Sequence, residues 1–234
     1  MVQNLIALII TFAISLIFLR VNDFAAHRGW ISSRFSRKII HIGTGPLFVL
    51  CWLLYNNEAY VRYLAALVPL TFTIQFFLIG IGKINDEASV KAMSRTGDRR
   101  EILKGPLYYG IIFVILTIVF WKDSPTGIVA LMLMCGGDGL ADILGRSYGK
   151  TKIPWNRNKS WIGSFGMFFG GWILTIFIMT IYTQALVFTP PFINYLFEIT
   201  LIALVGMIVE TLPLHDIDNI TVTLSAVVSG YLLF

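Results

Sequence analysis

Apolar residues gather in long runs along this chain, and short polar connections separate the runs. Runs of about 15 to 20 apolar residues are typical of helices that cross a lipid bilayer. The predicted spans are residues 4–20, 39–56, 61–82, 106–121, 126–145, 162–185, 194–211 and 219–233. The pattern therefore predicts an all-α polytopic membrane protein, with about eight transmembrane helices in one bundle and a single domain over residues 1–234.

Lys and Arg residues concentrate in alternate connections between these spans. Of the 18, 16 lie between the first and second, third and fourth, or fifth and sixth spans, and only Arg62 and Lys122 lie elsewhere. Basic connections face the cytosol by the positive-inside rule, so both termini are expected on the opposite side. Ten of the 13 acidic residues fall on the basic side. We therefore expect the active site at the cytosolic edge of the membrane.

Composition supports the membrane assignment and excludes some classes of function. The chain is 56% hydrophobic and 13% charged, with a mean hydropathy of +0.77, whereas soluble domains carry about 25% charged residues. Its formal net charge of +5 resides in the cytosolic connections, so nucleic acid is not an expected partner. The span centres carry almost no ionisable residue, which argues against the non-enzyme alternative, a lipid transporter.

Residues 135–163, CGGDGLADILGRSYGKTKIPWNRNKSWIG, place acids, glycines and cations together at the predicted membrane edge. Asp138 and Asp142 are four residues apart, so a helix presents both on one face. Two such carboxylates repel each other unless a cation lies between them, and Mg²⁺ takes carboxylate oxygens together with nucleotide phosphates. The stretch therefore predicts a nucleotide site. The alternative is that both acids form structural ion pairs with Arg146 and Lys150.

The glycines and cations of this stretch could serve the nucleotide. Glycines let the backbone approach a ligand, and the cations that follow can meet phosphate. The chain contains no GxxxxGK[ST] sequence, so any phosphate site is not a Walker A loop. The predicted contacts from the residues themselves are Gly137, Gly139, Arg146, Lys150 and Lys159.

Two further basic motifs precede this stretch. In RKIIHIGTG, Lys38 and His41 share one helix face, and Lys38 is a candidate phosphate contact. His41 is a candidate general base because it enters the apolar zone and needs a partner. The alternative is a membrane anchor with glycines for helix packing. In RREILKGP, Arg100 and Lys104 could face phosphate while Glu101 orients one of them, or Glu101 could simply pair with Lys104.

The connection VETLPLHDIDNI is acidic and contains no Lys or Arg. Its acids require a metal ion or the neighbouring basic connections as a counter-charge, and we favour a metal or catalytic role. The candidate metal ligands are Asp138, Asp142, Glu210, Asp216 and Asp218. The candidate catalytic residues are Asp138, Asp142, His41 and Asp218.

A separate prediction concerns residues 83–105, the only long polar connection. The stretch EASVKAM within it predicts a short helix that lies along the membrane surface.

Four motifs occur in an order that resembles the phytol kinase and farnesol kinase family, which is similar to dolichol kinase and, more distantly, to phosphatidate cytidylyltransferase. The motifs are RKIIHIGTG, EILKGPLYY, GDGLADILGRSYGKTKIPWNRNKSWIGS and VETLPLHDIDNITV. The likeness covers about residues 35–234. It implies a CTP-dependent kinase that phosphorylates a long isoprenoid alcohol, above all phytol, with Mg²⁺ as cofactor and a place in phytol recycling and tocopherol biosynthesis.

Family positions map onto residues of this chain. Asp138 and Asp142 match the acids of GDGxAD, and the resemblance adds Asn158 and Ser160 of the NKSW stretch to the nucleotide contacts. Ile162 stands where the cytidylyltransferase relatives carry Glu, which favours a kinase over that alternative. Farnesol, geranylgeraniol and dolichol are the alternative alcohols.

The expected partners and location follow from the same resemblance. The partners are CTP, the alcohol drawn from the lipid phase and membrane lipids, and an oligomer is compatible with the pattern. Plant members of the family carry a transit peptide, and no Arg-rich transit segment or signal peptide precedes the first span here. We therefore expect a cyanobacterial or other bacterial membrane, with the active face in the cytosol.

Overall fold

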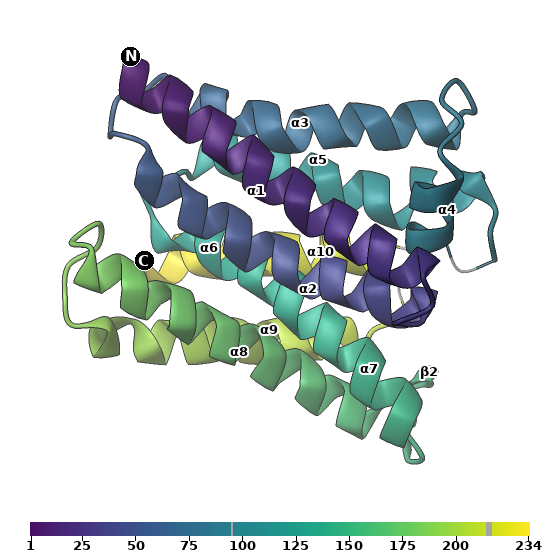
Figure 1. The fold of residues 1–234 in the computed structure, drawn as a ribbon. Coiled ribbons are helices and arrows are strands. Elements are labelled where there is room, and N and C mark those ends of the chain that lie inside the picture. The colour runs from purple at the N-terminus through teal and green to yellow at the C-terminus, as the bar shows by residue number, and fades with distance from the viewer. Residues whose placement is uncertain (95, 214–216) are drawn as a thin grey trace. The chain divides into compact units, whose positions relative to one another are not determined.

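The computed structural model describes residues 1–94, 96–213 and 217–234, and these are mostly helical (Figure 1). The chain divides into two compact units, Met1–Val119 and Phe120–Phe234.

Long helices that lie side by side build the first unit (Figure 1). They are α1 (Val2–His27), α2 (Ser33–Cys51), α3 (Val61–Gly80) and α5 (Gly105–Val119). A 3-10 turn, η1 (Trp52–Leu54), extends α2. Helices α3 and α5 approach closely at Gly110, where an added Cβ would lie 2.3 Å from Oγ1 of Thr73. The absence of a side chain at Gly110 therefore permits this contact.

The connection between α3 and α5 contains α4 (Glu87–Met93) and the 3-10 helix η2 (Arg99–Leu103). Helix α4 coincides with the stretch EASVKAM, so the predicted short helix is confirmed. Asp86 begins the helix, because its carboxylate accepts hydrogen bonds from the backbone N–H of Ser89 at 3.0 Å and from the Ser89 hydroxyl at 2.7 Å.

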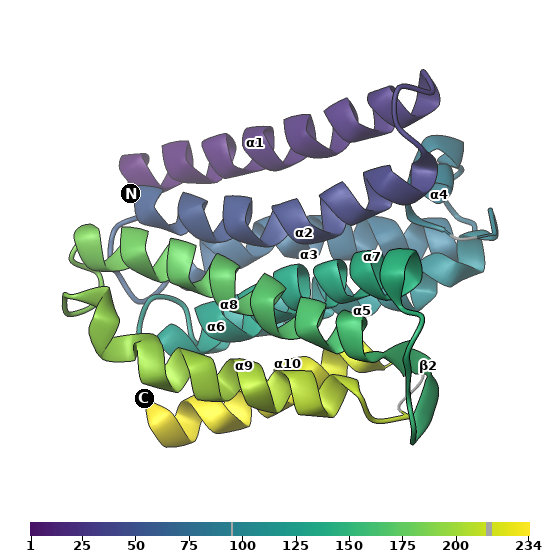
Figure 2. The ribbon, with the colours of Figure 1, turned by 90° about the horizontal axis from the view of Figure 1, so that it is seen from below.

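The second unit begins with one long helical segment in three parts and continues through a hairpin into three further helices (Figure 2). The first segment consists of α6 (Pro125–Met132), the π-helical turn η3 (Leu133–Gly137) and α7 (Asp138–Tyr148). The hairpin pairs β1 (Lys152–Ile153) antiparallel with β2 (Asn156–Ser160). The remaining elements are α8 (Trp161–Gln184), η4 (Phe192–Tyr195), α9 (Leu196–Glu210) and α10 (Asp218–Leu233).

The π-helical turn lies where the first segment packs against α8. Gly136 and Gly137 are buried, and an added Cβ on Gly136 would lie 2.6 Å from the carbonyl oxygen of Gly170. A π turn holds more residues than an α turn, so it changes the direction in which the following side chains point. Asp138 is the first residue after this turn.

Among the described residues, seven helical segments are long and apolar enough to cross a membrane. They coincide with the first seven predicted spans. Helix α10 has 16 residues and is therefore about 24 Å long, shorter than a hydrocarbon core of about 30 Å. The eighth predicted span is thus a helix, but it is shorter than the seven segments once the 3-10 turns that extend some of them are included. The all-α polytopic membrane fold is confirmed.

Candidate functional site

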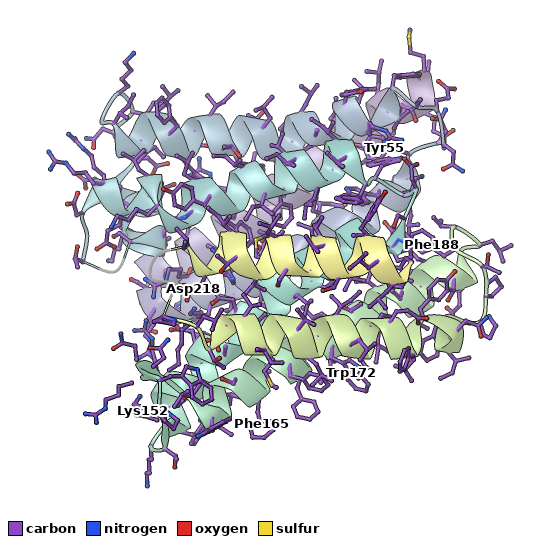
Figure 3. The ribbon with its side chains drawn as sticks, turned by 180° about the vertical axis from the view of Figure 1, so that it is seen from behind. Tyr55, Lys152, Phe165, Trp172, Phe188 and Asp218 are labelled. Atoms are coloured by element: carbon purple, nitrogen blue, oxygen red, sulfur yellow. The ribbon has the colours of Figure 1, made fainter. Side chains whose placement is uncertain are left out.

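Acidic and basic side chains of the second unit meet at one end of its helices, where α7 and α9 end and α8 and α10 begin. Lys152 of the hairpin and Asp218 of α10 lie at this end, and Phe188 lies at the other (Figure 3). The hairpin follows α7 and directly precedes α8, so it brings its own side chains to the same place.

Lys159 joins two acids that are far apart in the sequence. Its Nζ lies 2.7 Å from Oε1 of Glu210 and 2.6 Å from Oδ2 of Asp218. Lys159 belongs to β2, Glu210 ends α9 and Asp218 begins α10. The ammonium group therefore links three elements.

The contact of Lys159 with Glu210 is buried more deeply than its contact with Asp218. The Glu210 side chain is only 4% exposed, and its second oxygen accepts a hydrogen bond from the Ser164 hydroxyl at 3.3 Å. Burial of the ammonium works to lower the pKa of Lys159, but the Glu210 carboxylate and the hydrogen bonds to both acids outweigh it, so this pKa is raised above its ordinary value. Lys159 is therefore protonated at neutral pH. The basic connection thus supplies counter-charge to the acids of the 210–218 connection.

The two acids of α7 have different surroundings. Asp138 lies close enough to Glu210 for the two carboxylates to interact electrostatically. Asp142 accepts a hydrogen bond from Nε of Arg146, one helical turn further on. For Asp142, the alternative of a structural ion pair with Arg146 is therefore realised in the structure.

A Mg²⁺ ion at these acids would have to arrive with phosphate, because the described acids form no metal cage of their own. Within residues 1–94, 96–213 and 217–234, no group of three or more His, Cys, Asp or Glu side chains is arranged to hold a metal ion. Asp216 lies outside the described residues. Mg²⁺ is often bound by one or two carboxylates plus substrate phosphates. Oδ1 of Asp218 is buried and has no hydrogen-bond partner among the described residues, so it can serve as such a ligand.

Other predicted nucleotide contacts of the second unit differ in exposure. Gly137 and Gly139 are buried, and Gly137 faces Met167 of α8. Lys150 and Asn158 are exposed. Ser160 is 2% exposed and accepts a hydrogen bond from the backbone N–H of Gly163 at 3.3 Å, which caps α8.

Sequence reasoning missed two residues at the tip of the hairpin. Asn156 donates hydrogen bonds to the backbone carbonyls of Thr211 and Leu212, and the indole N–H of Trp155 donates to the Thr211 hydroxyl. Neither residue is charged, and neither stands at a recognisable spacing from the acids. Their position in the hairpin turn, after Pro154, was the available signal.

In the first unit, His41 lies beside Tyr109. The ring centroids are 4.7 Å apart, and the Tyr109 hydroxyl donates to the backbone carbonyl of His41 at 2.6 Å. The same hydroxyl lies 2.8 Å from Oγ1 of Thr44. Lys38 is half-buried one turn earlier on α2. The structure thus ties the RKIIHIGTG motif to the EILKGPLYY motif.

The remaining predicted contacts of the first unit lie at η2 and just after it. Arg100 and Lys104 are exposed. Glu101 accepts a hydrogen bond from the Thr96 hydroxyl at 2.8 Å. The nucleotide role of these residues stays a prediction.

Comparison with known proteins gives relatives along most of the chain. A protein named probable phytol kinase 1, chloroplastic, from Oryza sativa subsp. japonica is 42% identical over 217 residues, which is 92% of this chain and 69% of the relative. Phytol kinase 1, chloroplastic, from Arabidopsis thaliana is 38% identical over 88% of this chain and 69% of its own length. Farnesol kinase, chloroplastic, from Arabidopsis thaliana is 39% identical over 88% of this chain and 68% of its own length.

Comparisons with protein-family models and with solved structures give no further relatives. No protein-family model matches the chain, and no solved structure is significantly similar to it. The relatives above are chloroplastic plant proteins, so the expectation of a bacterial membrane is not borne out.

Proposed function

The chain belongs to the phytol kinase and farnesol kinase family, and we propose that it is a CTP-dependent kinase that phosphorylates phytol to phytyl phosphate. The cluster of Lys159, Glu210 and Asp218 at one end of the membrane helices carries the proposal. The product would feed phytol recycling and tocopherol biosynthesis.

The chemistry favours a site at the edge of the membrane. A long isoprenoid alcohol is apolar except for its hydroxyl, so its chain remains in the lipid phase, and the nucleotide arrives from water. Phosphoryl transfer between them depends mainly on positioning and on neutralisation of charge. Ionisable side chains at the ends of the spans are placed where the two phases meet.

The residues of the second unit divide these tasks. Glu210, Asp218 and Asp138 form the acidic side of the site, and Lys159 keeps the first two together. Mg²⁺, when bound with the nucleotide, supplies positive charge to the phosphate oxygens. The exposed Lys150 contributes further positive charge toward phosphate. A carboxylate near the alcohol accepts the hydroxyl proton. The general-base role of His41, which belongs to the first unit, stays a prediction.

Farnesol is the second candidate substrate, because one relative is named farnesol kinase at 39% identity. Phytol, farnesol and geranylgeraniol share a terminal hydroxyl and differ in the apolar chain. Comparison of kcat/KM among these alcohols with purified protein therefore identifies the preferred one.

The decisive experiment follows label from CTP in detergent solution. A kinase transfers the γ-phosphoryl group of CTP to the alcohol and releases CDP. A cytidylyltransferase instead transfers the labelled α-phosphate with its nucleoside and releases pyrophosphate. A transporter shows no turnover without a second compartment. A panel of ATP, GTP, UTP and CTP tests the donor, and equal rates with all four would contradict the proposed CTP dependence.

A further inference from the structure

The hairpin turn contacts the connection between α9 and α10 through a buried amide side chain. Nδ2 of Asn156 lies 3.1 Å from the carbonyl oxygens of both Thr211 and Leu212. Oδ1 of the same amide accepts a hydrogen bond from the backbone N–H of Asn158 at 3.2 Å. Asn156 is 6% exposed. Both amide hydrogens and the amide oxygen therefore have partners, and this pattern fixes the orientation of the side chain.

The location of these two carbonyls gives the contact its importance. Helix α9 ends at Glu210, so Thr211 and Leu212 are the first residues of the connection that leads to Asp218. The last carbonyls of a helix have no partner within the helix and need one from elsewhere. Asn156 supplies donors to the two carbonyls that follow, and so it fixes the direction in which the chain leaves α9.

Two neighbouring hairpin residues bind the same connection. The indole N–H of Trp155 donates to Oγ1 of Thr211 at 3.2 Å, and Lys159 holds Glu210 and Asp218. Trp155 and Asn156 of the hairpin thus contact the start of the connection between α9 and α10. Lys159 contacts Glu210 and Asp218, the residues on either side of that connection. No charged group takes part in the Asn156 contact, so it provides geometry without adding charge to the acidic cluster.

We propose that Asn156 is a positioning residue of the kinase site, which holds the 211–213 backbone so that Glu210 and Asp218 stand together around Lys159. This inference rests on the proposed function. It assigns Asn156 no contact with nucleotide or alcohol. Its effect on the reaction passes through Asp218, whose buried Oδ1 is available to the metal that accompanies the nucleotide.

The test replaces Asn156 with aspartate, N156D, which has nearly the same shape but cannot donate to the two carbonyls and adds a negative charge. The matched control is N194D, the same chemical change at an exposed position in η4. A second variant, W155F, keeps an aromatic ring, removes the indole N–H and adds no charge. It therefore separates loss of the contact from the added charge, and it remains informative if N156D does not fold.

The first readout is hydrogen exchange, which needs no activity. The amides of Ile220 and Thr221 bond to the Ile217 carbonyl and close the first turn of α10. Loss of two buried hydrogen bonds should speed their exchange by about 10-fold in N156D, with a smaller change in the same direction in W155F and none in N194D. Unchanged exchange in both hairpin variants would overturn the proposal.

The second readout separates positioning from general stability. We expect the KM for Mg-CTP to rise by about 5-fold or more in N156D, and to rise less but in the same direction in the neutral W155F, while the KM for phytol is unchanged in both. The reason is that the acids serve the nucleotide side of the site. Faster exchange with both KM values unchanged would overturn the link to the kinase site. If the wild-type protein phosphorylates no isoprenoid alcohol, the proposed function fails, and the exchange rates alone then decide whether Asn156 holds the connection.

Discussion

The hydroxyl of Tyr109 donates a hydrogen bond to the backbone carbonyl of His41 at 2.6 Å, and the two rings lie 4.7 Å apart. Tyr109 stands on α5 and His41 on α2, so one side chain fixes the spacing of two helices of the first unit. His41, the predicted general base, is therefore held in place by Tyr109, a residue to which the sequence analysis gave no role.

Replacement of Tyr109 with phenylalanine removes the hydroxyl and keeps the ring. We expect a loss of about 1 kcal/mol in the free energy of unfolding, because a part-buried hydrogen bond is lost without a cavity. Chemical unfolding in detergent micelles measures it. Tyr63→Phe, at an exposed position of α3, is the control. Equal stability of the two variants would show that the Tyr109 hydroxyl does not hold the helices.

Replacement of Lys159 with methionine leaves the buried Glu210 carboxylate without its counter-charge. Breaking a buried ion pair by removing one partner costs about 3 kcal/mol or more, so Lys159→Met should be strongly destabilised. The exposed Lys152→Met should lie within about 0.5 kcal/mol of wild type. The double variant Lys159→Met, Glu210→Gln should recover part of the loss, because it removes the more deeply buried of the two unpaired charges. A double variant no more stable than the single one would argue against this explanation.

The raised pKa of Lys159 predicts low reactivity toward acylating reagents. A cation whose pKa is raised in the folded state stabilises that state below its unfolded pKa, about 10.4 for Lys. This contribution disappears only as the pH rises through the higher folded value. At pH 9 to 10, Lys159 should therefore be acetylated much more slowly than the exposed Lys150 and Lys152. Mass spectrometry of timed digests gives the three rates, and similar rates would refute the charge assignment.

Replacement of Asp138 with asparagine tests the acidic side of the site. We expect CTP-dependent phosphorylation of phytol to be abolished while the thermal unfolding temperature stays near that of wild type, because the side chain keeps its size. Asp123→Asn, at an exposed position between α5 and α6, is the control for loss of one negative charge. Retained turnover in Asp138→Asn would contradict the metal-site assignment.

Close packing at the π-helical turn gives a separate prediction. A Cβ on Gly170 would lie 2.3 Å from the carbonyl oxygen of Gly136, whereas a Cβ on Gly105 would meet no atom within 4 Å. Gly170→Ala should therefore lose about 1–3 kcal/mol through strain, and Gly105→Ala should not show such a loss. The free energies of unfolding of both variants, measured under the same conditions, test this prediction. An unchanged free energy of unfolding for Gly170→Ala would show that α8 can move away from η3.

Features encoded in neighbouring residues were predictable from the sequence. Apolar runs indicated the spans, the EASVKAM alternation indicated α4, and the four-residue spacing of Asp142 and Arg146 indicated their ion pair. Each depends only on residues that are close together in the sequence: an unbroken apolar run for the spans, and helical spacing for α4 and the ion pair.

Features that depend on distant pairing were not predictable in the same way. Lys159 meets acids 51 and 59 residues further along the chain, and Asn156 meets carbonyls 55 and 56 residues away. These pairs depend on the register of the hairpin and on its placement against α9, neither of which leaves a periodic signal. The π-helical turn η3 was not predicted either, because its close contact with α8 at Gly136 and Gly137 joins residues far apart in the sequence.

Lys159 already satisfies two carboxylates, and this has a consequence for recognition of the nucleotide anion. An ammonium group so engaged has little attraction left for a triphosphate, so the long-range pull on the anion falls to cations in water such as Lys150. Dissolved salt screens interactions between solvent-exposed charges far more than interactions between buried or partly buried charges. Nucleotide binding should therefore weaken steeply as the ionic strength rises. The contacts of Lys159 with Glu210 and Asp218, which connect α9 to α10, should persist at the same salt concentration.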